Sequence, residues 1–218
     1  MLLPSFPAPI PSSRFSRPIN ASPGSNLWSK LTEEKAARKA LEVANVQNGE
    51  QVLEVAVGTG LLFREMVKRN PDGLNEGIDL SPAMLAKCEK LLASQPAQAW
   101  HLQQASAFEL PFPANHFDLL INNYMIDLLP EADFERVLGE FHRVLKPGGR
   151  AVITYFATGT RWYHFFWQKL AQYVPALLTN CRPIDLKPYV ALVGFEQIQT
   201  WEISQNSFPS VVLKCVKG

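Results

Sequence analysis

Two glycines and one aspartate stand at a spacing that suits the binding of a nucleoside. An apolar run ends in Gly58-Thr59-Gly60, and glycines let a backbone turn sharply and approach a ligand without a Cβ in the way. Asp79 follows about 20 residues later, at the end of a second expected strand, where its carboxylate can accept hydrogen bonds from both hydroxyls of a ribose. The pattern predicts a ligand that contains a nucleoside.

The residue at the third position of the glycine pattern bears on which nucleoside is bound. A dinucleotide fingerprint needs GxGxxG, but Phe63 stands where the third glycine would be. Its bulk opposes close packing of helix against strand and the approach of a pyrophosphate. NAD is therefore the less favoured cofactor, although a bare GxG after a strand also occurs in purely structural turns.

The elements that must position these residues alternate between strand and helix. This alternation implies βαβ crossovers and a mostly parallel sheet with helices on both faces. Two closing apolar stretches at 196–203 and 209–216 suit an antiparallel pair at one edge. We expect an α/β fold, Rossmann-like and doubly wound, with seven strands. The other expected strands lie in 51–57, 77–79, 100–104, 117–122 and 150–155, and the expected helices begin at Thr32, Leu61, Pro82 and Glu131.

Composition narrows the class of protein. The 218 residues are 47% hydrophobic and 19% charged, which suits one folded domain, expected at 26–218. A net charge of +1 offers no broad attraction for a phosphate backbone, so nucleic acid is an unexpected partner. Three widely spaced cysteines indicate neither a disulfide framework nor a metal site, and they favour a reducing, cytoplasmic location.

Residues 1–25 form a segment of different composition, rich in proline and serine. Such a composition neither forms a helix nor buries a core, and we expect a flexible arm. Because the arm carries Arg14 and Arg17 and no acidic residue, an organelle-targeting segment is an alternative to a plain extension.

Four motifs in order make residues 50–155 resemble the class I methyltransferases that use S-adenosylmethionine, of the type found in ubiquinone and menaquinone biosynthesis. The motifs are VLEVAVGTG (52–60), GIDLSPAML (77–85), ELPFPANHFDLL (109–120) and LKPGGRAVI (145–153). The resemblance implies S-adenosylmethionine as the cofactor and a small molecule as the methyl acceptor. Oligomeric state is left open.

The resemblance also implies which residues bind the cofactor. Residues of the first motif would line its methionine end, and the acid of the second motif would bind its ribose. Leu80, Met84, Ser106 and Ala107 would contact its adenine. The set is Glu54, Val57, Gly58, Thr59, Gly60, Asp79, Leu80, Met84, Ser106, Ala107 and Asn122. Two departures stand out: Ser106 replaces the usual acid that accepts from the adenine amino group, and Ala56 stands where many relatives carry Gly or Cys.

Residues near the ends of the fourth and fifth strands are the candidates for handling the acceptor. Displacement at a sulfonium methyl needs positioning and water exclusion, and it needs a base only if the acceptor arrives protonated. Asn123 and Tyr124 could orient an acceptor, Asp127 could take a proton if desolvated, and Tyr155 lies nearby. The alternative is that the asparagines cap strand ends and that Asp127 is a solvated residue at a helix start.

The segment 156–195 is the variable region in this family, where the acceptor is chosen. The aromatic residues of 162–167 fit either a lid over an apolar acceptor, with possible contact to a membrane surface, or a core-packing helix. His164 fits an ordinary surface or lid histidine. Arg182 could bind an anionic group on the acceptor or tie its loop to the sheet.

Two other functions remain open on the sequence alone. One is an NAD(P)-dependent reductase that shares the fold, and the other is a cofactor-binding partner protein without catalysis, which the Ser106 departure favours. The preferred hypothesis is a methyltransferase that acts on a small, apolar or amphipathic acceptor, quinone-like or lipid-like.

Overall fold

The computed structural model describes residues 34–157, 182–205 and 208–218. The expected arm at 1–25, the helix start at Thr32 and the aromatic residues 162–167 lie outside this range. The elements are α2 (Glu34–Ala44), β1 (Gln51–Val55), α3 (Leu61–Arg69), β2 (Leu74–Asp79), α4 (Pro82–Leu92), β3 (Trp100–Gln104), β4 (Phe117–Asn123), α5 (Phe134–Val144), β5 (Leu145–Phe156), α7 (Lys187–Leu192), β6 (Phe195–Gln205) and β7 (Phe208–Lys217), with short 3₁₀ turns at Ala97–Ala99, Ile126–Leu128 and Glu131–Asp133.

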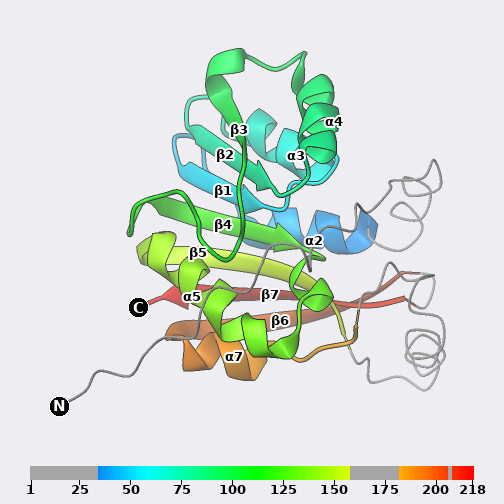
Figure 1. Ribbon diagram of the computed structural model, residues 1–218, viewed down its shortest axis with the longest axis vertical. Helices are drawn as coiled ribbons and strands as arrows, with labels where there is room; N and C mark the ends of the chain where they lie inside the picture. The colour runs from blue at the N-terminus through cyan, green and yellow to red at the C-terminus, as the bar shows by residue number, and fades with distance from the viewer. Residues whose placement is uncertain (1–33, 158–181, 206–207) are drawn as a thin grey trace.

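The strands form one seven-stranded sheet in the order β3-β2-β1-β4-β5-β7-β6 (Figure 1). The first five strands pair in parallel, whereas β7 is antiparallel to both β5 and β6. This confirms the expected α/β fold and the antiparallel pairing at one edge. The reversed strand lies one place inside that edge, because β7 inserts between β5 and β6.

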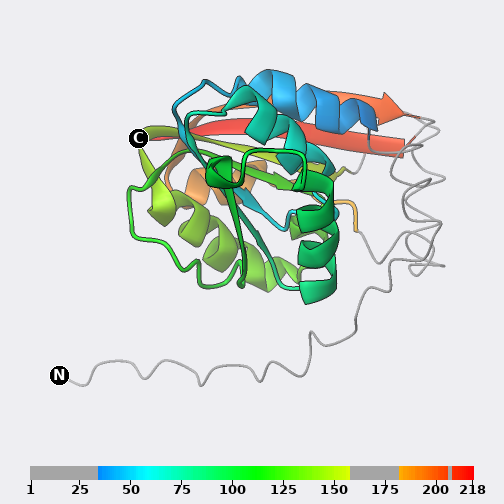
Figure 2. The ribbon, with the colours of Figure 1, turned by 90° about the horizontal axis from the view of Figure 1, so that it is seen from above.

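Helices cover both faces of the sheet, as the alternating pattern predicts (Figure 2). Val52, Leu119 and Val152 pack with residues of α2, α3 and α4 on one face. Leu53 and Leu120 pack with residues of α5 and α7 on the other. Because successive side chains of a strand point to opposite faces, each central strand supplies both cores.

Helix α2 crosses the first of these faces and is fixed at both ends. At its C-terminal end the Arg150 guanidinium donates to the carbonyl of Ala44 at 2.7 Å and to the Glu50 carboxylate at 2.8 Å. At its other end the Lys35 N–H donates to Gln205 Oε1 at 2.6 Å. The N-terminus of α2 therefore lies beside the end of β6, on the side of the sheet where β5 ends.

Two local details differ from the sequence expectations. The helix expected from Glu131 begins at Phe134, because Glu131–Asp133 forms a 3₁₀ turn after Pro130. Ser81 occupies the expected N-cap position before Pro82, but its side chain makes no capping bond. Its N–H instead donates to Asp79 Oδ1 at 2.8 Å. Within the described residues, no helix is long and apolar enough to cross a membrane.

Candidate functional site

The carboxyl ends of β1, β2, β4 and β5 lie at one side of the sheet, and the candidate site is built from the residues that follow them (Figure 1). Ligands of open parallel sheets bind at this side. The sheet order places β1 between β2 and β4, so the glycine turn after β1 lies between Asp79 and the asparagines of β4.

Asp79 points toward the glycine turn, as the nucleoside hypothesis requires. Its Oδ2 accepts from the Gly58 N–H at 2.9 Å, and its Oδ1 accepts from the Ser81 N–H at 2.8 Å. A carboxylate oxygen has two lone pairs, so each oxygen can accept one further hydrogen bond. Asp79 therefore fixes the turn and retains the capacity to hold a diol.

Gly58 and Gly60 of the turn differ in the space around them. Both have left-handed backbones, with φ of 55° at Gly58 and 82° at Gly60. A Cβ on Gly60 would lie 2.3 Å from Cys88 Sγ, whereas a Cβ on Gly58 would meet nothing within 4 Å. Gly60 thus permits α4 to pack against the turn, and Gly58 leaves a bare backbone facing open space.

Ala56 also has a left-handed backbone, with φ of 62°. This conformation costs an L-residue other than glycine about 1–2 kcal/mol. The methyl group at this departure from the family pattern therefore strains the backbone immediately before the turn.

We expect Ala56→Gly to raise the free energy of unfolding by about 1 kcal/mol. In a chain of this size that corresponds to an increase in Tm of roughly 2–4 °C. Ala86, exposed on α4, is the matched control, because Ala86→Gly removes helix propensity and should lower stability by about 1 kcal/mol. Equal losses in both variants, measured by urea denaturation, would show that Ala56 is not strained.

Glu54 is a buried acid at the end of β1, with only 3% of its surface exposed. Its Oε2 has no hydrogen-bond partner among the described residues. Burial, and secondly the nearby Asp79 carboxylate, raise the pKa of Glu54 well above the ordinary value of 4.5. A buried carboxyl without a partner is costly, so this position suits a ligand that brings a donor or a positive charge.

The ends of β4 and β5 carry further buried oxygen atoms without partners among the described residues: Asn122 Oδ1, Asn123 Oδ1 and Thr154 Oγ1. Asn122 donates through Nδ2 to the carbonyl of Val55 at 2.9 Å, which ties β4 to the end of β1. Sequence reasoning missed Thr154. The signal was a threonine among the aliphatic and aromatic residues of 151–156.

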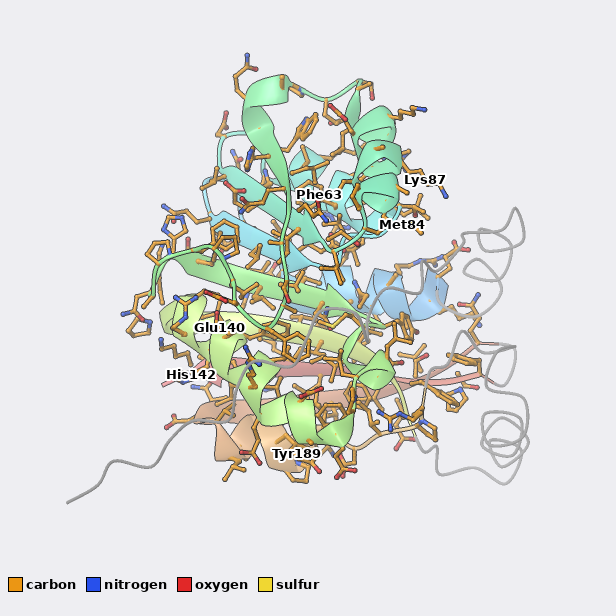
Figure 3. All side chains as sticks on the ribbon, viewed as in Figure 1. Phe63, Met84, Lys87, Glu140, His142 and Tyr189 are labelled. Atoms are coloured by element: carbon orange, nitrogen blue, oxygen red, sulfur yellow. The ribbon has the colours of Figure 1, made fainter. Side chains whose placement is uncertain are left out.

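The residues expected around an adenine lie after β2 and β3. Leu80 is 56% exposed, and Met84 lies on the first turn of α4, one turn before Lys87 (Figure 3). Ser106 is half-buried, and its Oγ accepts from the Phe108 N–H at 3.2 Å. Ala107 is half-buried, as is Thr59, while Val57 packs in the core beside α3.

The acceptor candidates fall in different environments. The Tyr124 hydroxyl lies 2.7 Å from Ser210 Oγ on β7. Asp127 is fully buried, and its Oδ2 accepts from the Phe156 N–H at 3.0 Å, so it is not the solvated residue of the alternative interpretation. Tyr155 is 2% exposed and lies in the core between the sheet, α5 and α7. Burial raises the pKa of its phenol, which argues against a role as a base.

Arg182 lies within the segment 156–195 and contacts the turn after β4. Its N–H donates to the Asp127 carbonyl at 3.1 Å, and its guanidinium donates to the Leu129 carbonyl. These contacts tie the loop of Arg182 to the turn after β4, and not directly to the sheet as the second sequence interpretation expects. Cys88 and Cys215 are buried free thiols, while Cys181 and His164 lie outside the described residues.

Residues 52–149 match the family described as "Methyltransferase domain". A demethylmenaquinone methyltransferase of Tropheryma whipplei is 30% identical over 196 residues, which cover 89% of this chain and 78% of that protein. A demethylmenaquinone methyltransferase of Thermus thermophilus is 31% identical over 152 residues, and this chain spans 66% of its length. Among solved structures, a Haemonchus contortus phosphoethanolamine N-methyltransferase in complex with S-adenosyl-L-methionine has a TM-score of 0.66 at 18% identity, covering 84% of this chain and 52% of that one.

Proposed function

Since the chain belongs to the class I methyltransferase family that includes the demethylmenaquinone methyltransferases, we propose that it transfers a methyl group from S-adenosylmethionine to a small, apolar or amphipathic acceptor. The single observation that carries the proposal is the bond between Asp79 and the Gly58 N–H. It joins the acid of one motif to the glycine turn of another, as a grip on a nucleoside requires.

The residues at the ends of β1 and β2 fit this cofactor. Open space beside Gly58 lets a ligand approach the bare backbone of the turn. The buried Oε2 of Glu54 lacks a partner among the described residues and suits the ammonium group of the methionine end. Asp79 keeps lone pairs for the ribose hydroxyls. Ser106 has a hydroxyl that can accept from an adenine amino group, more weakly than an acid would.

In methyl transfer from S-adenosylmethionine, the main contribution of the protein is to position the two reactants. S-adenosylmethionine supplies an activated methyl group with its own leaving group. Glu54 would hold the methionine end of this molecule and Asp79 its ribose, and the residues at the ends of β4 and β5 would orient the acceptor in line with the methyl. The buried surroundings of Asn122, Asn123 and Thr154 would keep water away from the reacting atoms.

The names of the relatives support the choice of acceptor class. Two relatives, 31% and 30% identical, are named demethylmenaquinone methyltransferases, which favours a quinone-like acceptor over a lipid headgroup. We therefore place the quinone-like acceptor first and the lipid-like acceptor second. A protein with an apolar acceptor of this kind would also be expected to contact membrane surfaces transiently.

Incubation of the protein with methyl-labelled S-adenosylmethionine and a whole-cell lipid extract tests the proposal. We expect labelled products, identified by mass spectrometry, that carry one additional methyl group. Binding of S-adenosylhomocysteine without transfer to any extract would favour a non-catalytic partner protein. Calorimetric titrations with NADH and with S-adenosylhomocysteine test the reductase hypothesis. We expect a binding signal from S-adenosylhomocysteine and none from NADH.

A substitution at Gly58 tests whether the open space belongs to the cofactor. We expect Gly58→Ala to lose about 1 kcal/mol of stability through its left-handed backbone and to bind S-adenosylhomocysteine at least about tenfold more weakly, because the new methyl group occupies the ligand's side of the turn. Gly60→Ala is the contrasting variant. Its Cβ would overlap Cys88, so this substitution should mainly lower the stability of the fold. Wild-type affinity in folded Gly58→Ala would place the cofactor elsewhere.

A further inference from the structure

Asn123 and Thr154 lie side by side at the ends of β4 and β5. They are paired residues in the register of the two strands, so their side chains share a face of the sheet. Thr154 is fully buried, and both Thr154 Oγ1 and Asn123 Oδ1 have no hydrogen-bond partner among the described residues. Buried polar side chains almost always have partners, so two adjacent exceptions indicate a missing ligand group.

A pair of hydroxyls borders these two oxygen atoms. The Tyr124 hydroxyl and Ser210 Oγ are 2.7 Å apart, and Ser210 is buried. Ser210 pairs with Phe156 and Val212 pairs with Thr154 in the register of β5 and β7, so Ser210 and Thr154 are diagonal neighbours on one face. The Tyr124 N–H also donates to the Thr154 carbonyl at 2.8 Å. We call Asn123, Tyr124, Thr154 and Ser210 the hydroxyl shelf.

One residue of the hydroxyl shelf, Tyr124, has a strained backbone conformation. Tyr124 has a left-handed backbone with φ of 49°, which costs a non-glycine residue about 1–2 kcal/mol. The surrounding bonds to Thr154 and Ser210 impose this conformation. Strained residues of this kind cluster at sites where a ligand is positioned.

We propose that Thr154 Oγ1, with Asn123 Oδ1, accepts a hydrogen bond from a hydroxyl group of the methyl acceptor and thereby selects hydroxylated rings over their ethers; this rests on the proposed function. An amide oxygen only accepts, and a threonine hydroxyl can accept as well. The Thr154 hydroxyl can also donate, but the Asn123 Oδ1 atom beside it can only accept, so a ligand group shared by the two atoms must be a donor. The reduced, hydroxyl-bearing form of a quinone supplies such a donor, and the oxidised form does not.

Thr154→Val tests this assignment because valine keeps the shape and removes the hydroxyl. The probes are naphthohydroquinone and its dimethyl ether, titrated anaerobically in the presence of saturating S-adenosylhomocysteine. We expect the wild-type protein to bind the hydroquinone about tenfold more tightly than the ether, the effect of one hydrogen bond. In Thr154→Val the preference should fall below about threefold, and Thr154→Ser should restore it.

Two further readouts separate this role from a structural one. The Tm of Thr154→Val should equal or exceed that of the wild type, because the substitution removes a buried hydroxyl without a partner. Its affinity for S-adenosylhomocysteine should stay within about twofold. A lost affinity for S-adenosylhomocysteine would assign Thr154 to the cofactor and overturn the inference.

An equal preference for the hydroquinone in wild type and Thr154→Val would also overturn it, as would a wild-type protein that fails to bind the hydroquinone or to distinguish it from the ether. These failures differ from failure of the proposed function. The latter would appear in the wild-type protein as absent binding of S-adenosylhomocysteine or absent methyl transfer to any extract.

Discussion

Asp79→Ala is expected to weaken the binding of S-adenosylhomocysteine about 100- to 10,000-fold. Two hydrogen bonds from the ribose hydroxyls to a charged acceptor are lost, each worth about 1.5–3 kcal/mol. The Gly58 and Ser81 N–H groups, which donate to Asp79 at 2.9 and 2.8 Å, also lose their acceptor. The bonds to the ribose exist only in the complex, so binding should suffer more than stability. Isothermal titration calorimetry on the folded variant measures the loss.

Asp118 provides the matched control for Asp79. It is an acid of the same sheet, but it pairs with Lys146 at 2.7 Å and accepts from the Gln51 N–H at the amino end of the strands. Asp118→Ala should lower stability and leave the affinity for S-adenosylhomocysteine within about threefold. If Asp79→Ala kept its affinity within the same limit, the nucleoside would not bind between the first two motifs.

Glu54→Gln is expected to weaken the binding of S-adenosylhomocysteine at least about 30-fold at neutral pH, because removal of one partner of a buried, hydrogen-bonded charge pair costs about 2–5 kcal/mol. The ligand's ammonium group needs the carboxylate, yet burial and the Asp79 charge raise the pKa of Glu54 in the free protein. Binding must then release a proton. The wild-type affinity should therefore tighten as pH rises through that raised pKa, and the affinity of Glu54→Gln should not.

The same pKa has the opposite consequence for the stability of the free protein. A carboxyl whose pKa is raised on folding contributes stability that is fully present below its ordinary pKa and is lost as pH rises through the raised value. Thermal unfolding without ligand should thus show a smaller loss of Tm above pH 4.5 in Glu54→Gln than in the wild type. Parallel pH profiles for the two proteins, in both binding and unfolding, would refute a titrating Glu54 at the site.

The order of elements and most strand positions could be predicted from the sequence because hydrophobic period and turn residues are local signals. The strand at 100–104 was predicted with the bounds that the structure gives. The short helix α7 was not predicted, since its six residues show less than two helical turns of pattern. The insertion of β7 between β5 and β6 depends on long-range pairing, which no local signal reports.

Parts of the candidate site could be predicted where functional side chains stand at a recognisable spacing. The rest could not, because the alternation of side chains along a strand decides which face each residue occupies. The glycine turn and Asp79 were assigned to one nucleoside site from their spacing, and the structure joins them by the bond from the Gly58 N–H. Thr154 and Tyr155 are neighbours at the end of one strand, and sequence reasoning chose the tyrosine for its functional group. Alternation along β5 sends Tyr155 into the core with α7 and Thr154 to the opposite face. A shift of one residue in register would exchange these environments.

The position of β7 governs the sequence in which the sheet can be completed during synthesis. Strand β6 leaves the ribosome before β7, yet its backbone reaches the remainder of the sheet only through β7. Until β7 is synthesised, neither the outer edge of β5 nor β6 has a strand to pair with. Unpaired strand edges promote association between chains, so the pairing of β7 also protects the outer edge of β5 from association.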